Sequence, residues 1–309
     1  MINFRFHLAS LIAIFLALAL GVVVGAGVID RGVVDTLNSR LDNVESRANR
    51  IQDDNNQLRD DNGKLTSAIE AQQCYVMRDQ LLGEDVGIVA VRGVDESTVK
   101  KAVAAVECGG GNVTGILWIE PKWALTSDSD VAALADALGS SSKKATTVRS
   151  TAWRELAARL KTPPADGATD LLATLEDAGF VTYESVNGDA TLVADFPARG
   201  ASILLVVGED GKVPDKDVVL PAATALSNEG LPLVVGDVYV SGDDRPDRGA
   251  AVSSIRDGSL ASKVSTVDDL DWPQGPATAG LALSDLRQVP PLVGHYGLST
   301  DKLMPDVAQ

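Results

Sequence analysis

The chain has 309 residues, of which 45% are hydrophobic, and a formal net charge of −16 at pH 7. This length accommodates one large domain or two small ones beside any non-globular part. Binding to nucleic acid and electrostatic docking on anionic lipid both need clustered basic residues, so the acidic composition argues against these two functions. We therefore expect no nucleic-acid partner.

Residues 8–29 form an apolar segment without a charged side chain. As a helix, this segment is long enough to cross the ~30 Å hydrocarbon core of a bilayer. It is also longer than the apolar part of a cleaved signal peptide. We therefore predict an uncleaved transmembrane helix in the cell membrane, with a cleaved signal peptide as the alternative.

The charges beside this segment predict its orientation. Arg5 precedes it, whereas the charges of Asp30 and Arg31 behind it cancel. The positive-inside rule therefore places residues 1–7 in the cytoplasm and the body of the chain outside the membrane.

Residues 30–73 show the pattern of a coiled-coil stalk, because apolar side chains recur at alternating steps of three and four residues. The apolar residues expected at a dimer interface are Leu37, Leu41, Val44, Ile51, Leu58 and Leu65. In the seven-residue repeat of a coiled coil, Leu41, Asn55 and Asn62 share position a, which faces the partner strand. A buried asparagine at this position costs stability but fixes the register of two parallel strands. We predict a parallel homodimer; the alternative is a single amphipathic helix packed on its own domain.

Two further patterns favour a dimer. Gly21 and Gly25 have the GxxxG spacing that lets two membrane helices approach closely. In a parallel pair, Arg40 of one strand would face Glu45 of the other, and these charges are opposite in sign.

Residues 74–309 read as one α/β domain, because short β-branched runs alternate with helical ones. Strands are predicted over residues 85–92, 113–119, 180–184, 202–207, 231–235 and 264–267. Helices are predicted over residues 96–107, 128–138, 150–160, 169–178, 218–228, 250–256 and 276–286. Several strands are apolar throughout, which is typical of strands covered on both faces. We therefore expect a doubly wound, Rossmann-like, mostly parallel sheet of five or six strands.

A doubly wound sheet binds ligands beyond the carboxyl ends of its strands. The loops that follow the predicted strands supply these pocket candidates: Arg92, Glu120, Lys122, Trp123, Glu209, Asp210 and Asp237. The glycines of residues 109–115 follow a helix and open a strand, the reverse of a phosphate-binding loop. We interpret them as a helix cap and a turn.

The sequence offers few groups for catalysis. Its two histidines are His7, at the membrane edge, and His295, in a predicted tight loop over residues 294–297. A nucleophile needs a base, and only His295 could serve outside the membrane. We therefore predict no catalytic residue and no enzymatic activity.

Cys74 and Cys108 are the two cysteines of the chain. In an oxidising compartment they would form a disulfide that joins the stalk to the first helix of the body. The alternative is a Cu(I) site, because Cys74 and Met77 offer soft ligands to which Cys108 and His295 could be added.

The chain resembles the mycobacterial copper transport protein B (MctB) family, also described as copper transport outer membrane proteins. The resemblance rests on the sequence FLALALGVVVG at residues 15–25, on the coiled coil behind it, and on Gly294-His295-Tyr296-Gly297. It implies a role in copper transport or homeostasis, with copper as the bound species. Similar proteins also imply an alternative: a non-enzymatic envelope scaffold that regulates cell separation and peptidoglycan hydrolysis with a cytoplasmic partner.

Overall fold

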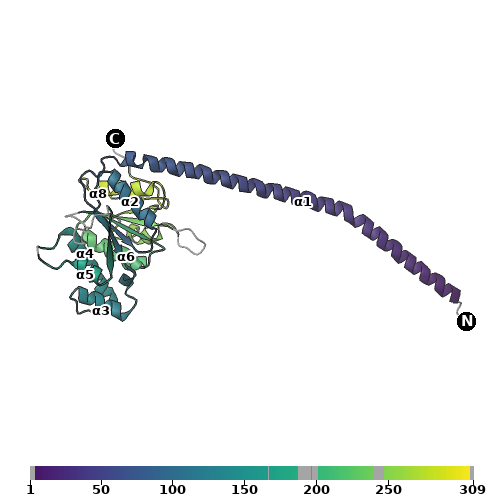
Figure 1. Ribbon diagram of the computed structural model, residues 1–309, viewed down its shortest axis with the longest axis horizontal. Helices are drawn as coiled ribbons and strands as arrows, with labels where there is room; N and C mark the ends of the chain where they lie inside the picture. The colour runs from purple at the N-terminus through teal and green to yellow at the C-terminus, as the bar shows by residue number, and fades with distance from the viewer. Residues whose placement is uncertain (1–3, 166, 187–195, 197–200, 240–246, 307–309) are drawn as a thin grey trace. The chain divides into compact units, whose positions relative to one another are not determined.

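The computed structural model describes residues 4–165, 167–186, 196, 201–239 and 247–306, and the side chains of these residues except 26–34 (Figure 1). The chain divides into two compact units, Met1–Leu65 and Thr66–Gln309. Each unit is described by itself.

The first helix, α1, runs without a break over Phe4–Met77. No proline occurs before Pro121, so nothing in this stretch removes a backbone hydrogen bond. Its segment Phe4–Gly25 is apolar and long enough to cross a membrane. The predicted boundary between stalk and domain, at residues 73 and 74, falls in the last turn of α1.

The predicted interface residues of the stalk are exposed in the single chain. Leu37, Leu41, Val44, Ile51, Leu58 and Leu65 are 54% to 63% exposed. A helix in water normally buries one apolar stripe. These side chains therefore remain available to a second surface.

The second unit is built on one sheet. Its strands are β1 Val86–Val91, β2 Gly115–Ile119, β3 Val181–Ser185, β4 Ser202–Gly208, β5 Leu233–Val238, β6 Ser265–Val267 and β7 His295–Tyr296. They lie in the order β3-β2-β1-β4-β5-β6-β7. β3 is antiparallel to β2, and the other neighbours are parallel. The predicted mostly parallel sheet is confirmed.

The number of strands was predicted wrongly, since the described residues form seven rather than five or six. The additional strand is β7, where we expected a tight loop. His295 lies opposite Thr266 and Tyr296 opposite Val267. A strand of two residues shows no alternation of its own, so only its pairing with β6 identifies it.

Helices cover the sheet. They are α2 Glu96–Cys108, α3 Asp128–Ala137, α4 Ala145–Lys161, α5 Leu171–Asp177, α6 Asp215–Asn228, α7 Ala250–Arg256 and α8 Gly275–Leu286, with a 3-10 turn η1 at Pro121–Ala124. α2 packs against α8, and α4 packs against α6 (Figure 1). All residues of β1, β4 and β5 are buried, as expected of strands covered on both faces.

Aromatic side chains fill the core beside β2. Trp123 lies 4.9 Å from Trp153 and 6.4 Å from Phe180, measured between ring centroids. These three rings join η1, α4 and the start of β3 in one cluster. Tilted and edge-to-face ring pairs of this kind add to the stability that burial provides.

Candidate functional site

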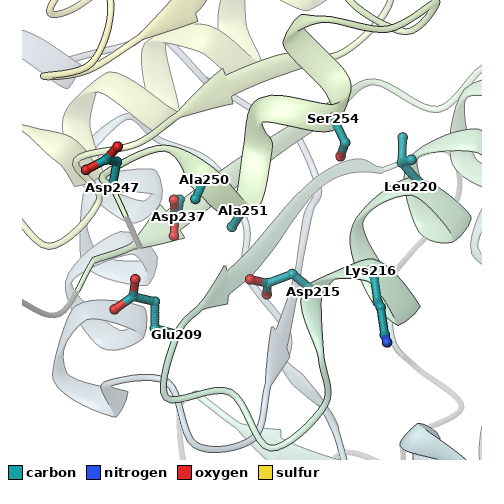
Figure 2. A pocket seen from close by; sticks show the side chains of 9 residues that line it. All are labelled: Glu209, Asp215, Lys216, Leu220, Asp237, Asp247, Ala250, Ala251 and Ser254. Atoms are coloured by element: carbon teal, nitrogen blue, oxygen red, sulfur yellow. The ribbon is translucent and has the colours of Figure 1, made fainter. Parts of the chain in front are cut away.

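A cavity of about 280 Å³ lies beyond the carboxyl ends of β4 and β5 (Figure 2). Its lining residues are Glu209, Asp215, Lys216, Leu220, Asp237, Asp247, Ala250, Ala251 and Ser254. Glu209 directly follows β4, Asp237 belongs to the end of β5, and Asp215 is the first residue of α6. We call this space the acidic cavity. Its position agrees with the rule that places ligands at this edge of a doubly wound sheet.

Two carboxyl groups of the acidic cavity have pKa values above that of a free aspartate. Burial, followed by the nearby carboxylates of Asp215, Asp268 and Glu209, raises the pKa of Asp237 to about 7, although the positive charge of Arg248 lowers it in part. Burial also raises the pKa of Asp215 to about 6, with a further contribution from Glu209. Both aspartates therefore change charge near neutral pH.

Two of the predicted pocket residues, Glu209 and Asp237, line this cavity, whereas Asp210 is absent from its lining. Asp215 and Asp247 were not predicted. The sequence does contain a signal for Asp215, because Pro214 and the acidic residues after it are typical of the start of a helix. We nevertheless predicted that this helix begins at residue 218.

The other pocket candidates lie elsewhere and contact one another or the core. Arg92 forms an ion pair with Glu120, at 3.0 Å, and its guanidinium lies 4.3 Å from the Trp118 ring centroid. Lys122 donates a hydrogen bond to the carbonyl oxygen of Ala178, and Trp123 is fully buried. These four candidates therefore join neighbouring elements, and none of them lines the acidic cavity.

Comparison with known proteins gives the family. A family profile described as "Copper transport outer membrane protein, MctB" matches residues 1–305. The chain belongs to the MctB family. The copper transporter MctB of Mycobacterium tuberculosis is 27% identical over 330 residues, covering all of both chains. The copper transporter MctB of Mycobacterium leprae is 29% identical over 313 residues, covering 96% of this chain and 95% of that protein. The resemblance in the sequence is confirmed.

The sulfur atoms of this MctB-family chain gather where α1 meets α2. Cys74 and Cys108 are joined in a disulfide, with their Cα atoms 4.8 Å apart. Met77 is fully buried, and a Cβ built on Gly109 would lie 3.0 Å from Met77 Cε. Three of the four predicted metal ligands therefore lie close together.

His295, the fourth predicted ligand, has other partners. Its Nε2 lies 3.1 Å from the Ala261 carbonyl oxygen, and its Nδ1 lies 3.0 Å from Thr266 Oγ1. Because a carbonyl only accepts, Nε2 donates, and a neutral ring accepts from the threonine at Nδ1. Burial and then Arg256 lower the pKa of His295, which agrees with this neutral form. Within the described ranges, no three His, Cys, Asp or Glu side chains are grouped to hold a metal ion.

The segment at residues 294–297 is positioned by Arg256. Its guanidinium donates to Thr266 Oγ1 at 2.8 Å, to Asp268 Oδ2 at 2.8 Å and to the Tyr296 carbonyl oxygen at 3.1 Å. Asp268 is 0% exposed. These bonds attach β7 to α7 and β6, which gives His295 and Tyr296 a structural role.

Proposed function

We propose that this chain is a single-pass protein of the cell envelope that takes part in copper transport or homeostasis without catalysing a reaction. Residues 1–7 lie in the cytoplasm and the unit Thr66–Gln309 lies outside the membrane. The observation that carries this proposal is the match to the copper transport family over residues 1–305. The apolar segment Phe4–Gly25 supports the membrane attachment.

Copper is the cargo, and its ligands are the sulfur atoms of Cys74, Met77 and Cys108. Thiolate and thioether sulfur are the soft donors that Cu(I) prefers. The disulfide withholds two of these donors. A thiol reductant supplies two electrons and two protons as it becomes a disulfide, whereas a phosphine supplies the two electrons as it becomes a phosphine oxide, and water then supplies the oxygen and the two protons. Either reaction gives two thiols, and Cu(I) then displaces the thiol protons. Copper binding is therefore coupled to the redox state of the cysteines.

A copper titration tests this assignment. The full-length chain in non-ionic detergent, reduced with a phosphine, should bind Cu(I) stoichiometrically, and the unreduced chain should not. Met77→Leu keeps the buried volume but removes a ligand, so it should weaken binding more than about tenfold. Met304→Leu is the control, because Met304 is a partly buried methionine packed against the core and is not one of the three proposed ligands. Equal Cu(I) affinity of the Cys74→Ser, Cys108→Ser double variant would disprove the assignment.

The second candidate function is a dimeric scaffold that regulates cell separation with a cytoplasmic partner. It is favoured by the exposed apolar column of α1, which a second copy in a parallel coiled coil would cover. At Gly21 and Gly25 a Cβ would meet no atom within 4 Å, which leaves room for a second helix. Asn55 and Asn62 would then pair across the dimer and set its register.

Lysine substitutions test the dimer. In Asn55→Lys with Asn62→Lys, two positive charges per strand would face their copies, and the dissociation constant of the dimer should rise more than about tenfold. The control is Asn49→Lys with Asn56→Lys. It adds the same charge at the residue that follows position a of its heptad, which lies outside the interface. Sedimentation of the full-length protein in detergent measures the dimer, and microscopy of separating cells measures the regulation. Unchanged dimerisation and cell separation in the first variant would disprove the scaffold.

A further inference from the structure

The turn between β6 and α8 contains a buried carboxyl group, that of Asp269. The residue is 0% exposed, and its Oδ2 accepts a hydrogen bond from Gln274 Nε2 at 2.7 Å. Its Oδ1 is also buried, and no described residue donates a hydrogen bond to this atom. Burying an ionised carboxylate is unfavourable unless both oxygens have donors. The turn therefore accommodates Asp269 best as a neutral carboxylic acid.

The groups around Asp269 agree with this neutral form. Burial raises the pKa of Asp269 to about 6, although the hydrogen bond from Gln274 lowers it in part. Of the charged groups that act on Asp269, the carboxylates of Asp268 and Asp271 raise its pKa further, and Arg248 lowers it. Asp269 therefore changes charge just below neutral pH.

Arg248, the cation that acts on Asp269, is bound to other acceptors in the same turn. Its Nη1 donates to Asp271 Oδ1 and to the Asp268 carbonyl oxygen, both at 2.8 Å, and its Nη2 donates to Asp271 Oδ2 at 3.0 Å. The ring centroid of Trp272 lies 5.9 Å from the guanidinium carbon of Arg248, and Trp272 is 44% exposed. A shift of Arg248 would therefore change the surroundings of the Trp272 ring.

Ionisation of Asp269 requires a rearrangement of this turn. A Cβ on Gly275 would overlap the Asp269 carbonyl oxygen, so the backbone of the turn is already closely packed. The ionised Oδ1 would need a donor, and a guanidinium holds its five N–H donors in one rigid plane. Turning one of them toward Asp269 would therefore also turn those that bind Asp271.

We propose that the turn between β6 and α8 is a pH-sensitive switch, in which ionisation of Asp269 draws Arg248 from Asp271 and changes the environment of Trp272. At acidic pH the neutral carboxyl group leaves the pair of Arg248 and Asp271 intact. At higher pH the carboxylates of Asp269 and Asp271 compete for one guanidinium. The switch goes beyond copper handling, since it involves none of the proposed copper ligands.

Tryptophan fluorescence of the full-length protein in non-ionic detergent tests the switch. The other tryptophans, Trp118, Trp123 and Trp153, are at most 1% exposed, whereas Trp272 lies in the turn itself. We expect the emission to change with a midpoint at about pH 6, the pKa of Asp269. Trp272→Phe should remove this transition, which assigns the signal to the turn.

Two aspartate variants distinguish Asp269 from the other acids that titrate in this range. Asp269→Asn keeps the shape of the side chain but cannot ionise, so the transition should disappear. Asp215→Asn is the matched control, because burial also raises the pKa of Asp215 to about 6, but this residue lies at the start of α6. In that variant the transition should remain.

Gln274→Leu provides a further variant in case Asp269→Asn fails to fold. It removes the hydrogen bond that favours the ionised form, so the midpoint should rise by about one pH unit. A merely structural role of Gln274 would not move the midpoint in this direction. The switch would be overturned by a flat pH profile of the unmodified protein, by a transition that persists in Asp269→Asn or is lost in Asp215→Asn, or by an unchanged or lower midpoint in Gln274→Leu.

Discussion

Replacing Arg256 with alanine is expected to lower the free energy of unfolding by about 3–5 kcal/mol, the range for breaking a buried ion pair from one side. The reason is Asp268, which is 0% exposed and would lose its cation. The substitution also removes the donors to Thr266 and to the Tyr296 carbonyl oxygen, so β7 would lose its attachment to α7.

Chemical denaturation of the full-length protein in detergent measures this effect. Arg154→Ala is the matched control: Arg154 is 64% exposed, and its pair with Glu155 should contribute less than about 1 kcal/mol. Arg256→Ala should also raise the pKa of His295, because Arg256 is one of the groups that lower it. Similar stability of the two variants would show that the Arg256 network holds β7 no better than a surface pair.

Opening the disulfide is expected to cost about 3–4 kcal/mol of stability. Cys74 and Cys108 are 34 residues apart in sequence, and a crosslink that closes a loop of this length restricts the unfolded chain by roughly that free energy. The same bond joins the end of α1 to the end of α2. Its loss should therefore destabilise the unit Thr66–Gln309 as a whole.

Denaturation with and without a phosphine reductant tests this. Reduction should shift the unmodified protein to the stability of the Cys74→Ser, Cys108→Ser variant and should leave that variant unchanged. Met77→Leu is a useful control, since this volume-conserving replacement beside the disulfide should cost less than about 1.5 kcal/mol and remain sensitive to the reductant. No response of the unmodified protein would mean that its cysteines are not paired.

The cost of opening the disulfide also bears on copper. In the oxidised protein, Cys74 and Cys108 stabilise the fold and cannot bind Cu(I). Reduction would lower the free energy of unfolding by about 3–4 kcal/mol and make two soft ligands available. Copper bound to both thiolates would restore part of the lost crosslink, because binding to the folded state alone stabilises that state. Under the copper proposal, Cu(I) should therefore raise the stability of the reduced protein.

The sequence alone determined most of the regular elements. The helix predicted over residues 250–256 coincides with α7, and the strand predicted over residues 85–92 contains β1 with one residue to spare at each end. The helix α7 was predictable because burial of one face, through Val252 and Ile255, imposes a period on neighbouring residues. The strand β1 and the apolar segment at the N-terminus were predictable as continuous apolar runs, and such runs are also local in the chain.

The candidate site was readable only in part. Loop positions after apolar strands predicted Glu209 and Asp237, which line the acidic cavity. The same rule also selected Arg92 and Glu120, which instead neutralise each other. The local sequence does not distinguish a loop residue that lines the cavity from one that pairs with a neighbouring loop. That difference depends on which loops meet at the edge of the sheet.

Only the tertiary structure decided what His295 and Asp237 do. His295 was a candidate copper ligand in a loop, but pairing of β7 with β6 and the bonds of Arg256 make it part of the sheet. Asp237 was one of many loop acids until β4, β5, α6 and α7 came together around it. Periodicity within a segment follows from its own side chains, whereas the partners of a polar group lie far away in the sequence and are chosen by the packing of the whole unit.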